Sequence, residues 1–65
     1  MFHFSQTNPE GPGRQDVAAL LRRVADAIEA LGDVEVFDIT YAVEVTAEGR
    51  EPSVSVYYDR PDPDA

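Results

Sequence analysis

Three carboxylates gather at the start of the longest β-prone stretch of this 65-residue chain, and grouped carboxylates can carry chemistry. Asp33, Glu35 and Asp38 lie close together in the sequence. Crowded or buried acids can exchange protons with a substrate or hold a hard cation. Alternation along a strand puts Asp33 and Glu35 on one face and Asp38 on the other, so the three do not converge unless a bulge intervenes. We interpret them as solvated loop and edge charges.

The single histidine, His3, is the other candidate for catalysis. With Ser5 and an aspartate it would form a nucleophile system, but a triad needs a rigid, sheltered geometry, and residue 3 lies at a terminus. One histidine and no cysteine also exclude a multi-histidine or thiolate metal site and a cysteine nucleophile. We therefore expect a protein that is not an enzyme, with no catalytic residue, no metal site and no cofactor.

One helix is the clearest element that the sequence predicts. Apolar residues step by three and four along one stripe: Val17, Leu20, Leu21, Val24, Ile28 and Leu31. Asp16 is expected in the first turn, where the helix dipole favours an anion. Gly32 follows the last apolar residue and suits a left-handed cap. The pattern predicts a helix over 14–31 with one buried face.

Three segments have the alternation of β-strands. Val34 to Thr46 is unbroken by Gly or Pro and is about twice the usual strand length. Phe2 to Ser5 is short, and Ser53 to Tyr58 alternates again after a turn at Ala47-Glu48-Gly49-Arg50. In the long segment the alternation slips by one residue, and a bulge near Phe37 would reconcile this.

These elements predict an α+β fold of the order β-α-β-β. The two long strands form a hairpin and the first strand lies beside the third, which gives a three-stranded antiparallel sheet of spatial order 2-3-1 under one helix. We expect one domain over 1–60 and a disordered acidic tail over 61–65. The predicted core joins the helix stripe to one face of each strand: Phe2, Phe4, Val17, Leu20, Leu21, Val24, Ile28, Leu31, Phe37, Ile39, Tyr41, Val43, Val45, Val54, Val56 and Tyr58.

One helix covers only one face of a sheet, and we predict that the opposite face carries the interface. That face is expected to hold small and partly apolar residues: His3, Val34, Val36, Asp38, Thr40, Ala42, Ser53, Ser55 and Tyr57. A sheet of this kind packs on another sheet or joins edges with a neighbour. The alternative is a solvated face, which antiparallel sheets allow. The predicted contact residues are Val34, Val36, Ala42 and Tyr57.

The charge balance narrows the class of partner. Thirteen Asp and Glu stand against five Arg, which gives a net charge of −8. This excess disfavours nucleic acid and anionic membranes and favours a basic protein partner. A GC-rich genome or a high-salt cytoplasm would produce the same bias. The chain has no long apolar run, and its first residues lack the pattern of a signal peptide, so we expect a cytoplasmic protein and no membrane association.

The small size of the chain favours self-association. A chain of this length buries only ~60% of the surface of its unfolded form, and small domains usually add disulfides, a metal or oligomerisation. Cysteine is absent, so of these stabilising devices self-association is the one that remains possible. We predict a small acidic module that forms homo-oligomers, as a dimer or higher, or binds another protein.

Three tyrosines on the predicted sheet, Tyr41, Tyr57 and Tyr58, suggest an alternative, because such rings can stack on a planar ligand. The strand-helix-strand-strand order and the length resemble the dodecins, small flavin-binding subunits that assemble into hollow dodecamers. The flavin-stacking Trp of that family is missing, with Val34 in that region, and Ser53 stands where a Gln is expected. The resemblance therefore implies an oligomer of this architecture without flavin. The alternative function is a small-molecule carrier that stacks a planar ligand between subunits.

Overall fold

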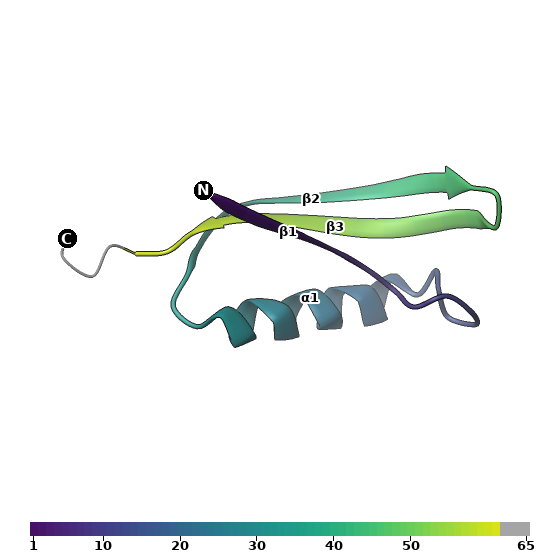
Figure 1. The fold of residues 1–65 in the computed structure, drawn as a ribbon. Helices are drawn as coiled ribbons and strands as arrows, with labels where there is room; N and C mark the ends of the chain where they lie inside the picture. The colour runs from purple at the N-terminus through teal and green to yellow at the C-terminus, as the bar shows by residue number, and fades with distance from the viewer. Residues whose placement is uncertain (62–65) are drawn as a thin grey trace.

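The computed structural model describes residues 1–61, which fold in the order strand, helix, strand, strand (Figure 1). The elements are β1 (Phe2–Thr7), α1 (Val17–Leu31), β2 (Glu35–Thr46) and β3 (Gly49–Asp59). The strands form one antiparallel sheet in the order β1-β3-β2, and α1 runs along one face of it. The predicted α+β class and the strand order are confirmed. Of the predicted tail over 61–65, residues 62–65 lie outside the described part of the chain.

The helix begins at Val17, later than the sequence suggested, because Asp16 caps it rather than joining its first turn. The Asp16 carboxylate accepts a hydrogen bond from the backbone N–H of Ala19 at 3.1 Å. At the other end Gly32 has a φ of 81° and donates its N–H to the carbonyl of Glu29. A positive φ is readily adopted by glycine, and the helix ends at Gly32 as predicted. Its ψ of −141° differs from that of the left-handed cap that the sequence suggested.

The loop between β1 and α1 is tied to the helix start by a buried asparagine. Asn8 is buried, and its side-chain amide donates to the carbonyl oxygens of Asp16 at 2.8 Å and Arg14 at 3.1 Å. Carbonyl groups of such a loop need partners when water is excluded. Asn8 supplies those partners, and it thereby fixes where α1 begins.

The long hairpin contains the bulge that the alternation predicted. β2 and β3 pair from Glu35 opposite Asp59 to Thr46 opposite Gly49, with a shift of register between Val36 and Asp38. The shift turns Val36 onto the helix side, opposite Tyr58. The bulge at Phe37 is therefore confirmed.

The hydrophobic core lies between α1 and the strands β1 and β3. Its buried members are Leu20, Val24, Val54, Val56 and Tyr58, with Phe4, Ile28 and Val36 packed against them. Tyr58 stacks on the ring of Phe2 at a centroid distance of 5.6 Å and meets Phe4 edge-on at 6.2 Å. This core closes only part of the sheet.

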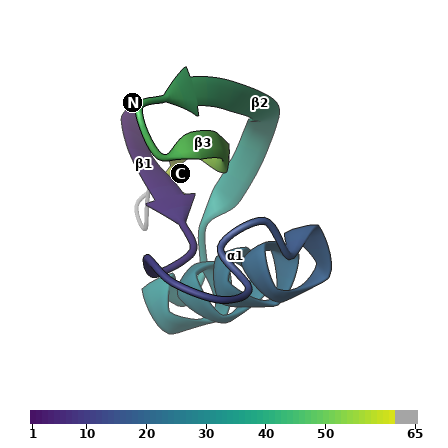
Figure 2. The same ribbon diagram turned by 90° about the vertical axis from the view of Figure 1, so that its right-hand side faces the viewer.

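The predicted core was too large. Eight of the residues assigned to it are exposed to solvent: Phe2, Val17, Leu21, Phe37, Ile39, Tyr41, Val43 and Val45. The physical reason is width. A helix is ~10 Å across and strands lie ~4.8 Å apart, so one helix covers two strands. Here those strands are β1 and β3. Figure 2 shows α1 on one side of the sheet, and residues 1–61 form no second helix on the other.

Candidate functional site on the uncovered side of β2

The main exposed apolar feature is a row of side chains on β2, which we call the β2 row: Ile39, Tyr41, Val43 and Val45. Ile39 lies opposite Val56 and Tyr41 opposite Val54, so the row lies on the helix side of the sheet. Both valines of β3 are fully buried, whereas members of the β2 row are 45% to 82% exposed. The side chains of the row are apolar like those of a core, but they are exposed to solvent.

The cover is missing because α1 packs on β1 and β3 alone. No Cα atom of β2 comes within 8 Å of one in α1. The connection from Leu31 to Glu35 is short, and it brings the chain back at the far side of β3 from β1. The helix axis is thereby displaced from β2, and the β2 row faces solvent beside the helix.

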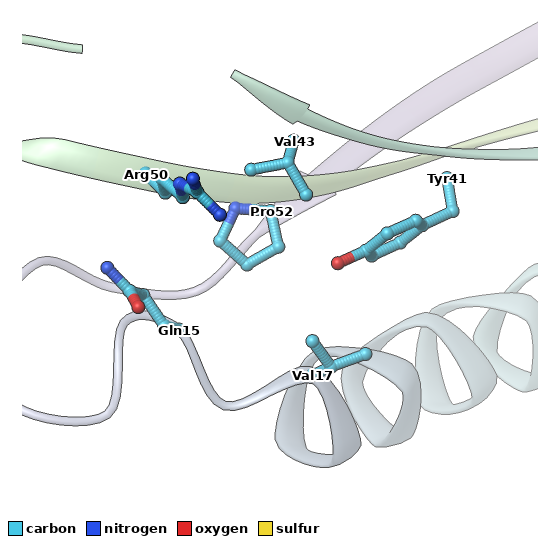
Figure 3. A pocket seen from close by; sticks show the side chains of 6 residues that line it. All are labelled: Gln15, Val17, Tyr41, Val43, Arg50 and Pro52. Atoms are coloured by element: carbon cyan, nitrogen blue, oxygen red, sulfur yellow. The ribbon is translucent and has the colours of Figure 1, made fainter. Parts of the chain in front are cut away.

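A groove lies between the start of α1 and the β2–β3 hairpin. Its volume is about 190 Å³, and its lining comes from three segments: Gln15, Val17, Tyr41, Val43, Arg50 and Pro52. In Figure 3 Tyr41 and Val43 come from β2, Arg50 and Pro52 from β3, and Val17 from the helix. The groove makes the β2 row continuous with the exposed apolar side of α1.

The exposed apolar side chains of β2 and α1 together approach the size of a protein interface. They are the β2 row, Phe37 at the bulge, and Val17 and Leu21 of α1. An aromatic side chain has ~150–250 Å² of surface and an aliphatic one has less, so these seven, about half exposed, present roughly 500–700 Å². A specific interface buries ~800 Å² on each partner, and the largest patch on a monomer is usually ~300–600 Å².

β2 also has a free edge. It pairs with β3 on one side only, so alternate backbone N–H and C=O groups point outward along its other side. From Asp38 to Thr46 the strand has no Pro, Gly, Lys or bulge, the devices that usually protect an edge. The second free edge of the sheet, on β1, is only six residues long. β2 is therefore the edge open to pairing.

The four predicted contact residues do not form one surface. Ala42 and Tyr57 lie on the face away from the helix, opposite Ser53 and Asp38 respectively. Val36 was placed on that same face, but it packs against the core on the helix side, because the bulge reverses its direction. Val34 precedes β2 and is half-buried.

The face away from the helix is polar and internally paired. The Ser5 hydroxyl is hydrogen-bonded to that of Ser55 at 2.8 Å, and the His3 ring stacks on Tyr57 at 5.6 Å. The hydroxyl of Ser5 is thus engaged across the sheet and is not paired with His3. These contacts tie β1 to β3, while the side chains of β2 on this face, such as Thr40 and Glu44, remain exposed and polar.

The carboxylates do not assemble into a site within residues 1–61. No group of three or more His, Asp or Glu side chains is placed there to hold a metal ion. The Asp59 carboxylate instead pairs with the N-terminal amine at 3.1 Å. The bulge puts Glu35, opposite Asp59, on the same face of the sheet as Asp38, opposite Tyr57, so the predicted placement of these two carboxylates on opposite faces was wrong. All three acids, Asp33 included, are exposed surface charges.

The three tyrosines have three different surroundings. Tyr58 is buried in the core and Tyr57 stacks on His3, so neither ring has both faces free. Tyr41 is half exposed and lines the groove. It is therefore the tyrosine best placed to meet a ligand or a partner.

Sequence reasoning missed the β2 row as a surface because period-two alternation marks an apolar face without telling what covers it. Ile39 and Val43 were assigned to the core on that alternation alone. The available signal was the ratio of elements: one helix cannot cover three strands.

Comparisons of the chain with protein-family models, curated proteins and solved structures find no match. Within the described residues, α1 is too short and too polar to cross a membrane.

Proposed function

We propose that this protein is a small, non-enzymatic association module that forms homo-oligomers through the apolar surface of β2. The observation that carries the proposal is the exposure of the β2 row. Ile39 and Tyr41 lie opposite fully buried valines of β3, yet within residues 1–61 the side chains of the row remain 45% to 82% exposed. Burying apolar surface of this extent is the main driving force of association. A second copy would supply the missing cover.

The distribution of charge supports a second copy as the partner, despite the net charge of −8. Asp38 and Glu44 of β2 point to the face away from the helix, because their partners in β3 are Tyr57 and Glu51. The surface formed by the β2 row, Val17 and Leu21 carries no acid. Two such surfaces can meet around a two-fold axis without opposing like charges.

Light scattering tests the proposal. At ~0.1 mM, far above the dissociation constant of a stable dimer, the wild-type chain is expected to have at least twice its 7.2 kDa mass. Ile39→Glu places a charge in the β2 row and is expected to give a folded monomer. Ala30→Glu adds the same charge on an exposed part of α1 that does not share a face with Leu21, and it should leave the oligomer intact. A folded wild-type monomer at this concentration would contradict the proposal.

A second candidate function, a carrier of a planar small molecule, is favoured by the groove beside Tyr41. The groove combines a half-exposed aromatic ring with apolar walls and the polar groups of Gln15 and Arg50, a mixture typical of small-molecule sites. Protein purified from its native host would show absorbance above 300 nm if a chromophore were bound. Tyr41→Ala should remove that absorbance. A spectrum of tyrosine alone would count against a chromophore.

A further inference from the structure

We infer that two copies of this chain join edge to edge, with their β2 strands antiparallel and Ala42 beside the two-fold axis. The inference rests on the proposed self-association and adds its geometry. It would give a continuous six-stranded sheet with both helices on the same side. The partner is a second copy because both sides of this pairing are the same free edge of β2. The unpaired backbone N–H and C=O groups of each strand would bond to those of the other.

Within residues 1–61 the outer edge of β2 is unpaired and regular. β2 is the longest strand, with 12 residues, and it lies at the border of the sheet. Its regular part, Asp38 to Thr46, follows the bulge at Phe37 and contains nothing that blocks pairing. An exposed edge of this kind is a template for another strand. The regular segment has its midpoint at Ala42.

Charge and the length of the regular segment together select the register. Symmetric pairing centred on Val43 avoids opposed acids, but within the regular segment it aligns only Thr40 to Thr46. Symmetric pairing centred on Tyr41 would set Asp38 opposite Glu44 twice, and like charges directly opposite destabilise a sheet. Pairing centred on Thr40 would bring the bulged Phe37 into the ladder. Pairing centred on Ala42 uses the whole regular segment and places threonines, Thr46 and Thr40, opposite the two acids.

The same register aligns the two β2 rows. Ile39 would lie opposite Val45 of the second copy, and Tyr41 opposite its Val43. Cross-strand neighbours have Cβ atoms ~4.5–5.5 Å apart, so each row contacts the open flank of the other. The register centred on Ala42 thus also pairs apolar side chains with apolar side chains.

The absence of cysteine allows a direct test with single-cysteine variants. Thr40, Ala42 and Glu44 lie exposed on the face away from the helix, opposite Ser55, Ser53 and Glu51. Under mild oxidation Ala42→Cys is expected to form a disulfide-linked dimer. Thr40→Cys or Glu44→Cys alone should not, because each would lie ~13 Å from its counterpart at ~3.4 Å per residue. A mixture of these two variants should cross-link. Ala42→Ser is the matched control without a thiol.

Light scattering on the same variants separates the inference from the proposed function. A dimeric mass with no Ala42→Cys linkage would show that the copies associate in another way, and it would overturn the inference alone. A linkage of Thr40→Cys by itself would overturn the register. A monomeric mass would overturn the inference together with the proposed function.

Discussion

Leu20 and Leu21 are neighbours in the sequence, and replacing each with alanine separates the buried side of α1 from its open side. Leu20 is 0% exposed and packs with Val54 and Val56, whereas Leu21 is 51% exposed. Truncating a fully buried leucine costs ~2–5 kcal/mol. Proteins have ~0.05–0.15 kcal/mol of stability per residue, so a chain of this size has roughly 3–10 kcal/mol in all. Leu20→Ala therefore removes a large part of the total.

The melting temperature makes the difference measurable. A domain of this size loses ~4–8 °C for each kcal/mol, so a loss of ~2–5 kcal/mol means that Leu20→Ala should melt at least ~8 °C below the wild type. Leu21→Ala removes a side chain that is already half in water and should cost ~1 kcal/mol. Circular dichroism at 222 nm, recorded during heating, gives both values. Equal losses in the two variants would refute the position of the helix over β1 and β3.

Two further predictions concern polar residues. Asn8→Ala should lower the free energy of unfolding by ~1–3 kcal/mol, because part-buried carbonyl groups lose their donor. Asn8→Asp should lower it further, because a carboxylate would face the carbonyl oxygens of Arg14 and Asp16. Urea titration measures both values, and an aspartate variant as stable as the alanine variant would contradict these contacts. Glu51→Lys should stabilise the hairpin by ~0.2–1 kcal/mol, because Glu51 lies opposite Glu44. Its gain in melting temperature should shrink at 1 M salt, and a gain that is independent of salt would show another cause.

The order of the strands and the bulge at Phe37 could be predicted because both follow from local pattern. A slip in alternation requires an extra residue in one strand, and the short final turn requires a hairpin. The cap at Gly32 follows in the same way from a glycine after the last apolar residue. Asp16 was harder, because an acid before a helix serves equally as a first-turn residue or as a cap.

The position of the helix could not be predicted. The apolar stripe of α1 tells that one side is buried, but it does not tell which two of three strands lie beneath it. Leu21 and Tyr41 were therefore assigned to the core and are exposed. Val36 was misplaced for a related reason: the bulge was expected, yet its effect on the residues before it was not carried through to the choice of face. The exposure of these side chains depends on where the helix lies over the sheet, and the periodicity of the sequence does not give that position.

The central place of β3 has a consequence for how the chain folds. β1 and β2 do not touch each other; each is paired only with β3, which is the last strand to be synthesised. Ser5 and Ser55, which share a hydrogen bond, are 50 residues apart. Contacts of such sequence separation form late and slow the search. Until β3 emerges, neither outer strand has a partner in its own chain, and the β2 edge is available to any other chain nearby. Pairing of both outer strands within the chain therefore has to wait for the synthesis of β3.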